Sequence, residues 1–242
     1  ELRELIDKQH IIDRFSKSPL KLLKQKGSLY PKKLREIFQS IYALKEKRIC
    51  LIGPRGGGKT FLCAELGFCL YLLKGFDVAL LGGSLNQSQK LYSIVQDCLF
   101  SDKEVEELTE QSIKTLTVGA RGNKIHCFTA SSKTVRGPHI GNMQRGGLLV
   151  VDEECETEEG IVRSAMGIVQ TAHPSIIIRS STFHKLGGTF ENLVDNHQSL
   201  GYILYKWDIF DVAEKCKYDC STCIVCVFCQ LRAKNKDRGW IP

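Results

Sequence analysis

The sequence predicts an α/β fold in which helices flank a mainly parallel central sheet. Short apolar segments typical of buried strands alternate along the chain with longer segments of helical spacing. The run at 148–151 contains only apolar residues, as expected of a parallel strand that is covered on both faces. A glycine-rich loop at 53–60 joins the first predicted strand to a helix, which indicates a βα unit.

The composition is that of a globular protein of one large domain, or of one domain with an appendage. The chain has 242 residues, of which 43% are hydrophobic and 25% are charged. No apolar run reaches the ~18 residues of a membrane span, and no signal peptide opens the sequence. We therefore expect a protein that is neither membrane-bound nor secreted.

The first 47 residues form a predicted helical and basic region. Residues 1–26 place apolar side chains at helical spacing, and residues 32–44 do so again after a break at 27–31. The net charge of +7 arises in residues 1–50, which hold 13 Lys and Arg against 6 Asp and Glu. Such a region suits either contact with nucleic acid or a solvated helical surface.

Residues 53–60, Gly-Pro-Arg-Gly-Gly-Gly-Lys-Thr, match the phosphate-binding loop pattern G-x-x-x-x-G-K-[ST]. The glycines let successive backbone N–H groups point at phosphate oxygens, Lys59 would reach the β- and γ-phosphates, and Thr60 would hold Mg²⁺. A strand at 48–52 and a helix at 59–73 supply the context that this loop requires. The alternative is a glycine-rich turn with an incidental lysine. The predicted nucleotide ligands are Gly53, Pro54, Arg55, Gly56, Gly57, Gly58, Lys59 and Thr60.

Further strands and helices extend this unit into a core that spans residues 48–212. The segment 102–112 is acidic and is either a solvated helix or a loop, and 116–118 with 124–129 suggest a hairpin. The predicted strands are 77–81, 148–151, 175–179 and 202–207, and the predicted helices are 88–99, 157–172 and 190–197.

Acidic residues follow the buried run at 148–151. Ligands bind at the carboxyl ends of strands in open α/β sheets, so Asp152 is placed to hold Mg²⁺ through a bound water. Glu153 would act as the catalytic base that positions the attacking water, with Glu154 as the second candidate. The alternative is a strand that runs into an acidic surface turn.

Together these motifs resemble the ATPase domain of large terminase subunits, the DNA-packaging motors of tailed phages and related viruses. The resemblance covers roughly residues 28–210 and rests on 53–60, on Leu-Leu-Val-Val-Asp-Glu at 148–153 and on Ile-Ile-Ile-Arg-Ser-Ser-Thr-Phe at 176–183. It also includes 83–90, the pair at 136–137 and the segment 30–36. It implies a P-loop NTPase of the additional-strand, catalytic-glutamate (ASCE) type.

The resemblance implies that ATP hydrolysis with Mg²⁺ moves viral double-stranded DNA into a procapsid in the host cell cytoplasm. The implied partners are a portal protein, a small terminase subunit and further copies of the chain in a ring. Ser180, Ser181 and Thr182 would form the motif that couples hydrolysis to movement. Since few residues follow Cys229, we expect no nuclease domain and no DNA cleavage.

The resemblance also suggests two further roles. Arg55 is a candidate γ-phosphate contact, and Arg136 is a candidate arginine finger with Arg145 as its competitor. Glu36 stands where the family has an adenine-recognising glutamine, and Gln39 competes for that role.

Five cysteines lie within residues 216–229 of a predicted linker that spans 213–242. Their spacing is typical of a structural zinc site, for which we favour Cys216, Cys220, Cys223 and Cys229, with Cys226 possible. Reduced, unligated cysteines are the alternative, and an iron–sulfur cluster is a weaker one.

Two rival functions fit parts of the same pattern. A superfamily-2 helicase-like ATPase lobe shares the loop and the acidic strand, but a helicase needs a second lobe. A zinc-stabilised nucleic-acid-binding module could bind nucleotide without turnover.

Overall fold

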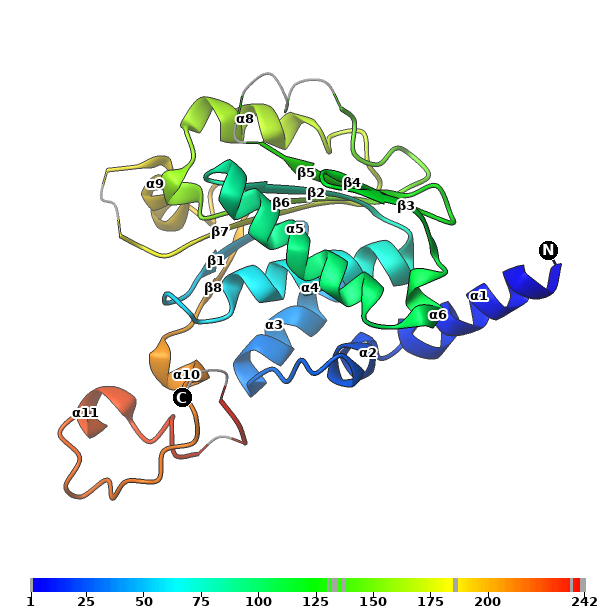
Figure 1. The fold of residues 1–242 in the computed structure, drawn as a ribbon. Coiled ribbons are helices and arrows are strands. Elements are labelled where there is room, and N and C mark those ends of the chain that lie inside the picture. Colours follow the sequence, from blue (N-terminus) through cyan, green and yellow to red (C-terminus); the bar gives the residue numbers. More distant parts are fainter. Residues whose placement is uncertain are drawn as a thin grey trace.

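The structure is a computed structural model that describes residues 2–129, 131, 135, 138–184, 187–235 and 237–239. Within them, eight strands form one sheet in the order β3-β4-β5-β2-β6-β7-β1-β8 (Figure 1). All pairings from β5 to β8 are parallel, while β3, β4 and β5 are antiparallel neighbours, so the predicted mainly parallel sheet is confirmed. The strands are β1 (Arg48–Ile52), β2 (Asp77–Gly82), β3 (Thr109–Ile113), β4 (Leu116–Gly119), β5 (Lys124–Phe128), β6 (Gly147–Asp152), β7 (Ser175–Ser181) and β8 (Ile203–Lys206).

Helices cover both faces of the sheet, as predicted. The larger core lies between the sheet and the helices α3, α4 and α5, and the smaller core lies under α8 and α9 on the opposite face (Figure 1). The helices are α1 (Leu2–Ser16), α2 (Pro19–Gln25), α3 (Lys32–Tyr42), α4 (Lys59–Lys74), α5 (Leu85–Phe100), α6 (Lys103–Glu106), α8 (Glu159–Gly167), α9 (Thr189–Asp195), α10 (Ile209–Val212) and α11 (Cys226–Cys229). No helix in the described part of the chain combines the length and the apolar character that crossing a bilayer requires.

Local chemistry explains where the structure departs from the predicted boundaries. The helix expected at 88–99 begins at Leu85, because the Ser84 side chain caps it by accepting a hydrogen bond from the backbone N–H of Gln87. The helix expected at 157–172 is only α8, since Thr157 ends a preceding 3₁₀ turn (Glu154–Glu156) in an extended conformation.

Two other segments are divided more finely than the sequence predicted. The apolar and basic stretch 1–26 forms two helices, and the second begins with Pro19 at its first position. The acidic segment 102–112 is neither one helix nor a loop, because it contains the short α6 followed by the edge strand β3.

The N-terminal helices belong to the same core as the sheet. Phe15, Leu22 and Leu34 are buried in the cluster that contains α4. Below them, the hydroxyl groups of Ser28 and Tyr30 both donate to the carboxylate of Glu65, which lies inside α4 and is 2% exposed. The boundary that we predicted after residue 47 remains a prediction.

The strand register gathers three loops at one edge of the sheet. Ile52 at the end of β1 lies opposite Ser181 of β7, and Asp152 at the end of β6 lies opposite Gly82 of β2. Because these strands are parallel, the loops after β1, β6 and β7 emerge side by side. The glycine loop, Asp152 and the Ser180–Thr182 motif lie in these loops or at these strand ends.

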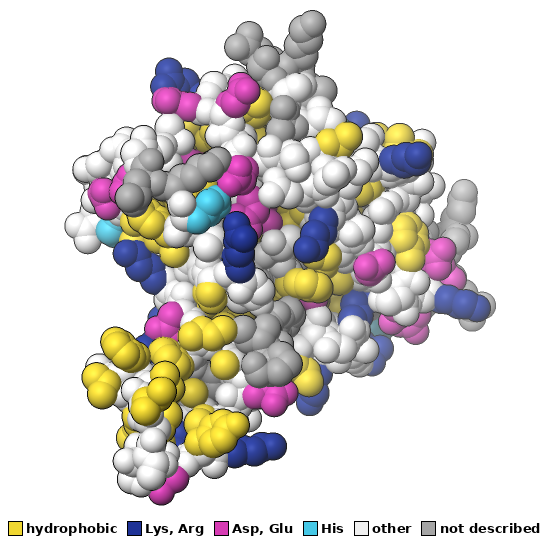
Figure 2. All heavy atoms as spheres, turned by 60° about the vertical axis from the view of Figure 1, so that its left-hand side comes forward, with side chains coloured by type: hydrophobic (Ala, Val, Ile, Leu, Met, Phe, Trp, Pro, Cys, Tyr) yellow, Lys and Arg dark blue, Asp and Glu magenta, His cyan; other side chains and the backbone are white. Residues whose placement is uncertain are grey.

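The cysteine-rich segment lies below the sheet and exposes apolar side chains. Figure 2 shows hydrophobic side chains gathered over this part of the molecule, and they include Ile224, Val227 and Phe228, which are 91%, 77% and 71% exposed. Ion pairs tie the described part of the segment to its surroundings: Arg232 pairs with Asp208 and Asp211, and Asp237 pairs with Arg35 of α3.

Candidate nucleotide site

The loop between β1 and α4 borders a cavity of about 590 Å³. Gly56 and Gly58 adopt φ angles of 69° and 85°, a conformation that disfavours residues with a Cβ atom. Gly58 stands immediately before α4, whose N-terminal backbone N–H groups have no partner within the helix. The loop therefore presents a helix N-terminus to the cavity, and its binding of phosphate remains a prediction.

Lys59 lies at the base of this cavity and is 4% exposed. Its ammonium group donates to the carbonyl oxygens of Gly53 and Pro54, at 3.0 and 3.1 Å, and to the Thr182 hydroxyl at 2.7 Å. Burial lowers the pKa of Lys59, although the nearby carboxylates of Glu153 and Asp152 oppose the shift. The side chain is thus a cation held between the phosphate loop and the end of β7.

Thr60 and Asp152, the predicted magnesium ligands, are in direct contact. The Thr60 hydroxyl donates to one oxygen of the Asp152 carboxylate at 2.7 Å, and the buried Ser180 hydroxyl donates to the other. Hydroxyl and carboxylate oxygens are ligands that suit Mg²⁺. The Thr60 hydroxyl and the Asp152 carboxylate therefore fit a magnesium ion.

The two candidate bases, Glu153 and Glu154, occupy different environments. Glu153 has left-handed backbone angles, φ 53° and ψ 47°, and its side chain lines the cavity. The following residue turns inward: the Glu154 carboxylate is 1% exposed and accepts two hydrogen bonds from the Arg179 guanidinium. Because an ion-paired carboxylate away from the cavity has no route to an attacking water, the geometry favours Glu153.

Each residue of the predicted coupling motif touches a different part of the site. Ser180 donates to Asp152, the Ser181 hydroxyl accepts a bond from the backbone N–H of Cys155 at 3.2 Å, and Thr182 accepts the bond from Lys59. The end of β7 is thus joined at once to the phosphate loop and to the acidic strand end.

The predicted arginines are only partly brought to the cavity. Arg55 lines it. Arg136 lies outside the described residues. Arg145 precedes the amino end of β6, where it donates to the carbonyl oxygens of Arg121 and Gly122 at 2.7 Å. Arg145 therefore lies at the amino ends of the parallel strands, whereas the phosphate loop lies at their carboxyl ends. For this reason it does not reach the cavity within the same chain.

Glu36 and Gln39 are not among the residues that line the phosphate cavity. Glu36 lies on the exposed side of α3 beside Lys32, and it borders a separate cavity of 320 Å³ that Arg232 and Asp211 also line. Gln39 borders a third cavity. Their role in binding adenine remains a prediction.

Three side chains that the sequence did not point to complete the site. His184 and Glu156 line the mouth of the cavity, where the Nδ1 of His184 lies 2.7 Å from the Thr182 carbonyl oxygen and Nε2 lies 2.5 Å from Glu156. Below the loop, Trp207 donates from its indole N–H to the Gly57 carbonyl at 2.8 Å. A Cβ atom at Gly53 would overlap this indole ring, so the tryptophan fixes the position of the loop from beneath.

We expect His184 to have a higher pKa than His126. The hydrogen bond to Glu156 and the bond to the Thr182 carbonyl raise the pKa of His184, whereas burial lowers the pKa of His126. The raised pKa means that this contact stabilises the fold below the unfolded pKa of about 6.5 and stops doing so as the pH rises through the folded pKa. Histidine ring resonances followed by NMR should show the high value, and Glu156→Gln should lower it while leaving His126 unchanged. Equal pKa values for His184 in both proteins would contradict the pairing.

The zinc site is not confirmed. Among the described residues, no three His, Cys, Asp or Glu side chains are grouped so that they could hold a metal ion. A hydrogen bond with Cys220 raises the pKa of Cys226, and desolvation and the nearby Cys223 and Cys229 raise it further. The backbone N–H of Cys216 donates to the Ala233 carbonyl.

The parallel sheet, the glycine loop before α4 and the acidic end of β6 together define the fold of a P-loop nucleoside-triphosphate-binding protein. No protein-family model matches the sequence, and no curated protein does. Among solved structures, the fold is similar to large terminases. The structure of the HK97 bacteriophage large terminase is matched over 86% of this chain with a TM-score of 0.61 and 14% identity.

Large terminase structures from a thermophilic bacteriophage give the same result. One matches 76% of this chain with a TM-score of 0.56 and 12% identity, and another, in complex with ATP-gamma-S, matches 76% with a TM-score of 0.55 and 11% identity. The matches cover 43–47% of the terminase chains, so this chain spans less than half of their length. The resemblance that the sequence predicted is confirmed at the level of the fold.

Proposed function

We propose that this chain hydrolyses ATP as the motor domain of a large terminase. The observation that carries the proposal is that Lys59, Thr60 and Glu153 line one cavity. Thr60 bonds Asp152 beside it, and Lys59 bonds Thr182 at the end of β7. A binding module without turnover needs the loop alone. It does not need a free carboxylate beside a magnesium-type site.

Each side chain has a separate role in ATP hydrolysis. Lys59 neutralises charge that develops on the transferred phosphoryl group, and Arg55 lies where it can do the same. Thr60 and Asp152 would hold Mg²⁺, which neutralises phosphate charge when bound. Glu153 orients the attacking water and accepts its proton. Gln87 also lines the cavity, and its buried Oε1 has no hydrogen-bond partner among the described residues, so it can accept one from substrate or water.

Binding of a triphosphate also changes the link to β7. In the structure the ammonium group of Lys59 is shared between the loop carbonyls and Thr182. A phosphate that accepts a hydrogen bond from this ammonium group competes for it with the Thr182 hydroxyl. The carbonyl oxygen of the same residue contacts the His184 ring. Nucleotide occupancy is in this way transmitted to the loop after β7, which is the step that a motor requires.

The proposal extends to viral DNA packaging. The similar solved structures are large terminases, and we infer double-stranded DNA as substrate, with a portal protein, a small terminase subunit and a homo-oligomeric ring as partners in the host cell cytoplasm. The test is ATP hydrolysis by the purified chain, with and without duplex DNA and the portal. Stimulation by both supports packaging, whereas hydrolysis that responds to neither contradicts it.

A structural zinc ion in residues 213–242 is a separate part of the proposal. It rests on the spacing of Cys216, Cys220, Cys223 and Cys229, with Cys226 as a possible ligand, because the described side chains form no metal-binding group. Elemental analysis should find one zinc per chain. Cys220→Ser, which removes a proposed ligand, should lower the zinc content. A metal-free protein whose melting temperature is unchanged by a chelator would contradict the site.

A further inference from the structure

A second large cavity lies on the sheet face that α8 covers. Its volume is about 580 Å³, and its floor is formed by β1 and β7, between α8 and the segment that leads into β8. Arg48 and Ser175, the first residues of their strands, line it, whereas the phosphate loop follows the carboxyl end of β1. This cavity, here called the β1–β7 groove, therefore opens at the edge of the sheet opposite the nucleotide site.

The groove is strongly basic. Lys47, Arg48, Arg163 and Arg179 line it, and the described lining contains no carboxylate. Lys47 and Arg48 are exposed, and the Arg163 side chain is 76% exposed. Among the described residues, Arg163 pairs with Glu159 of its own helix at 2.6 Å. An exposed pair of this kind is weak, so the guanidinium remains available to a stronger anion. Cations on two walls of one groove suit a ligand with repeated negative charges.

The aromatic residue of the groove, Tyr202, packs inside the protein and is not placed to stack on bases. Tyr202 is 5% exposed and lies against the guanidinium groups of Arg48 and Arg179, at 5.9 and 5.5 Å from its ring centre. Proteins that bind single strands stack unpaired bases on accessible aromatic rings. A buried ring leaves only the cations for contact, which favours the sugar–phosphate backbone of a duplex.

One residue connects this groove to the nucleotide site. Arg179 lines the groove, and two of its nitrogens bond the carboxylate of Glu154, the neighbour of Glu153. The next residue along β7 is Ser180, which bonds Asp152. An anion that binds the Arg179 guanidinium therefore affects the chain segment that carries Glu153, the proposed base.

We propose that the β1–β7 groove binds the phosphate backbone of duplex DNA and transmits its occupancy to the nucleotide site through the Arg179–Glu154 pair. The choice of DNA as partner rests on the proposed motor function, but the site and its test do not require hydrolysis.

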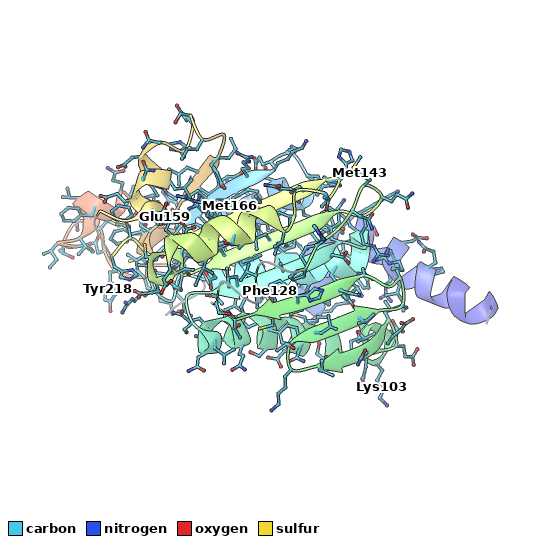
Figure 3. All side chains as sticks on the ribbon, turned by 90° about the horizontal axis from the view of Figure 1, so that it is seen from above. Lys103, Phe128, Met143, Glu159, Met166 and Tyr218 are labelled. Carbon is cyan, nitrogen blue, oxygen red and sulfur yellow. The ribbon has the colours of Figure 1, made fainter. Side chains whose placement is uncertain are left out.

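The test compares two charge reversals of equal size. Lys47→Glu with Arg163→Glu changes the groove, whereas Lys103→Glu with Lys114→Glu changes two exposed lysines near the β3 edge of the sheet. Figure 3 shows Lys103 at the side of the sheet away from Met166, a groove residue on α8. Binding of a short fluorescent DNA duplex is measured by anisotropy without nucleotide over a series of salt concentrations. If the charge reversal unfolds the groove variant, Lys47→Gln with Arg163→Gln replaces it.

We expect the groove variant to bind duplex at least about tenfold more weakly, with a salt dependence reduced by about two charges. The control variant should bind as the wild type does. Equal losses in both variants, or a wild-type preference for single strands, would overturn the proposal. It also fails if the groove variant alters self-association and not DNA binding, because the groove then receives an acidic surface of a second copy. The binding assay contains no ATP. A chain that lacks ATPase activity would therefore contradict the proposed motor function without changing the result of this assay.

Discussion

Replacing Glu153 with alanine should reduce the turnover of ATP by about a hundredfold to ten-thousandfold, the usual contribution of a general base. The carboxylate lines the cavity beside the Thr60–Asp152 pair, and its left-handed backbone directs it there while the next side chain turns into the core. ATP binding should persist, because Lys59 and the loop are untouched. Steady-state hydrolysis and binding of a fluorescent nucleotide measure the two effects separately.

Glu153→Gln serves as the matched variant, since it keeps the shape of the side chain and removes its basicity. Both variants should lose turnover to a similar degree. Hydrolysis that survives in either protein would show that Glu153 is not the base. Loss of binding together with hydrolysis would point instead to damage of the phosphate loop.

Replacing Glu154 with alanine should act on stability and cost about 3–5 kcal/mol of the free energy of unfolding. Glu154 and Arg179 form an ion pair in which both side chains are less than a tenth exposed. Removing the carboxylate leaves the guanidinium buried without its counter-charge, which is far less favourable than the intact pair. Chemical denaturation monitored by circular dichroism measures the loss.

Two comparisons show whether the cost comes from the unpaired charge. Glu154→Leu combined with Arg179→Met should restore much of the stability, because apolar residues of similar volume often replace a buried pair without loss. Glu159→Ala breaks the exposed pair with Arg163 and should change stability by less than about 1 kcal/mol. A small effect of Glu154→Ala alone would show that Arg179 finds another partner.

The sequence predicted the parts of the site that depend on local order along the chain. The glycine loop lies between a strand and a helix, and Asp152 ends a wholly apolar run, so both could be placed without knowing the fold. The sheet itself followed from the alternation of strands and helices. Only the antiparallel edge strand β3 was hidden, because its sequence Thr-Glu-Gln-Ser-Ile is mostly polar and its residues are mostly exposed.

The contacts between distant segments could not be predicted. Glu153 and Glu154 are chemically identical, and only the position of Arg179 across the β6–β7 pairing distinguishes them. His184 and Glu156 are 28 residues apart and meet because two strand ends are neighbours. In the cysteine segment, the ligands that the spacing favours remain a prediction, since the described side chains form no metal-binding group.

The tryptophan beneath the phosphate loop gives the molecule a built-in optical probe. Trp207 touches both ends of the loop, through its packing on Gly53 and its bond to Gly57. The emission of an indole depends on the polarity and hydrogen bonding around it, so rearrangement of the loop should change the intrinsic fluorescence. The only other tryptophan is Trp240, which lies outside the described residues, and replacing it with phenylalanine would leave a single emitter. Nucleotide arrival could then be followed in real time without an attached dye.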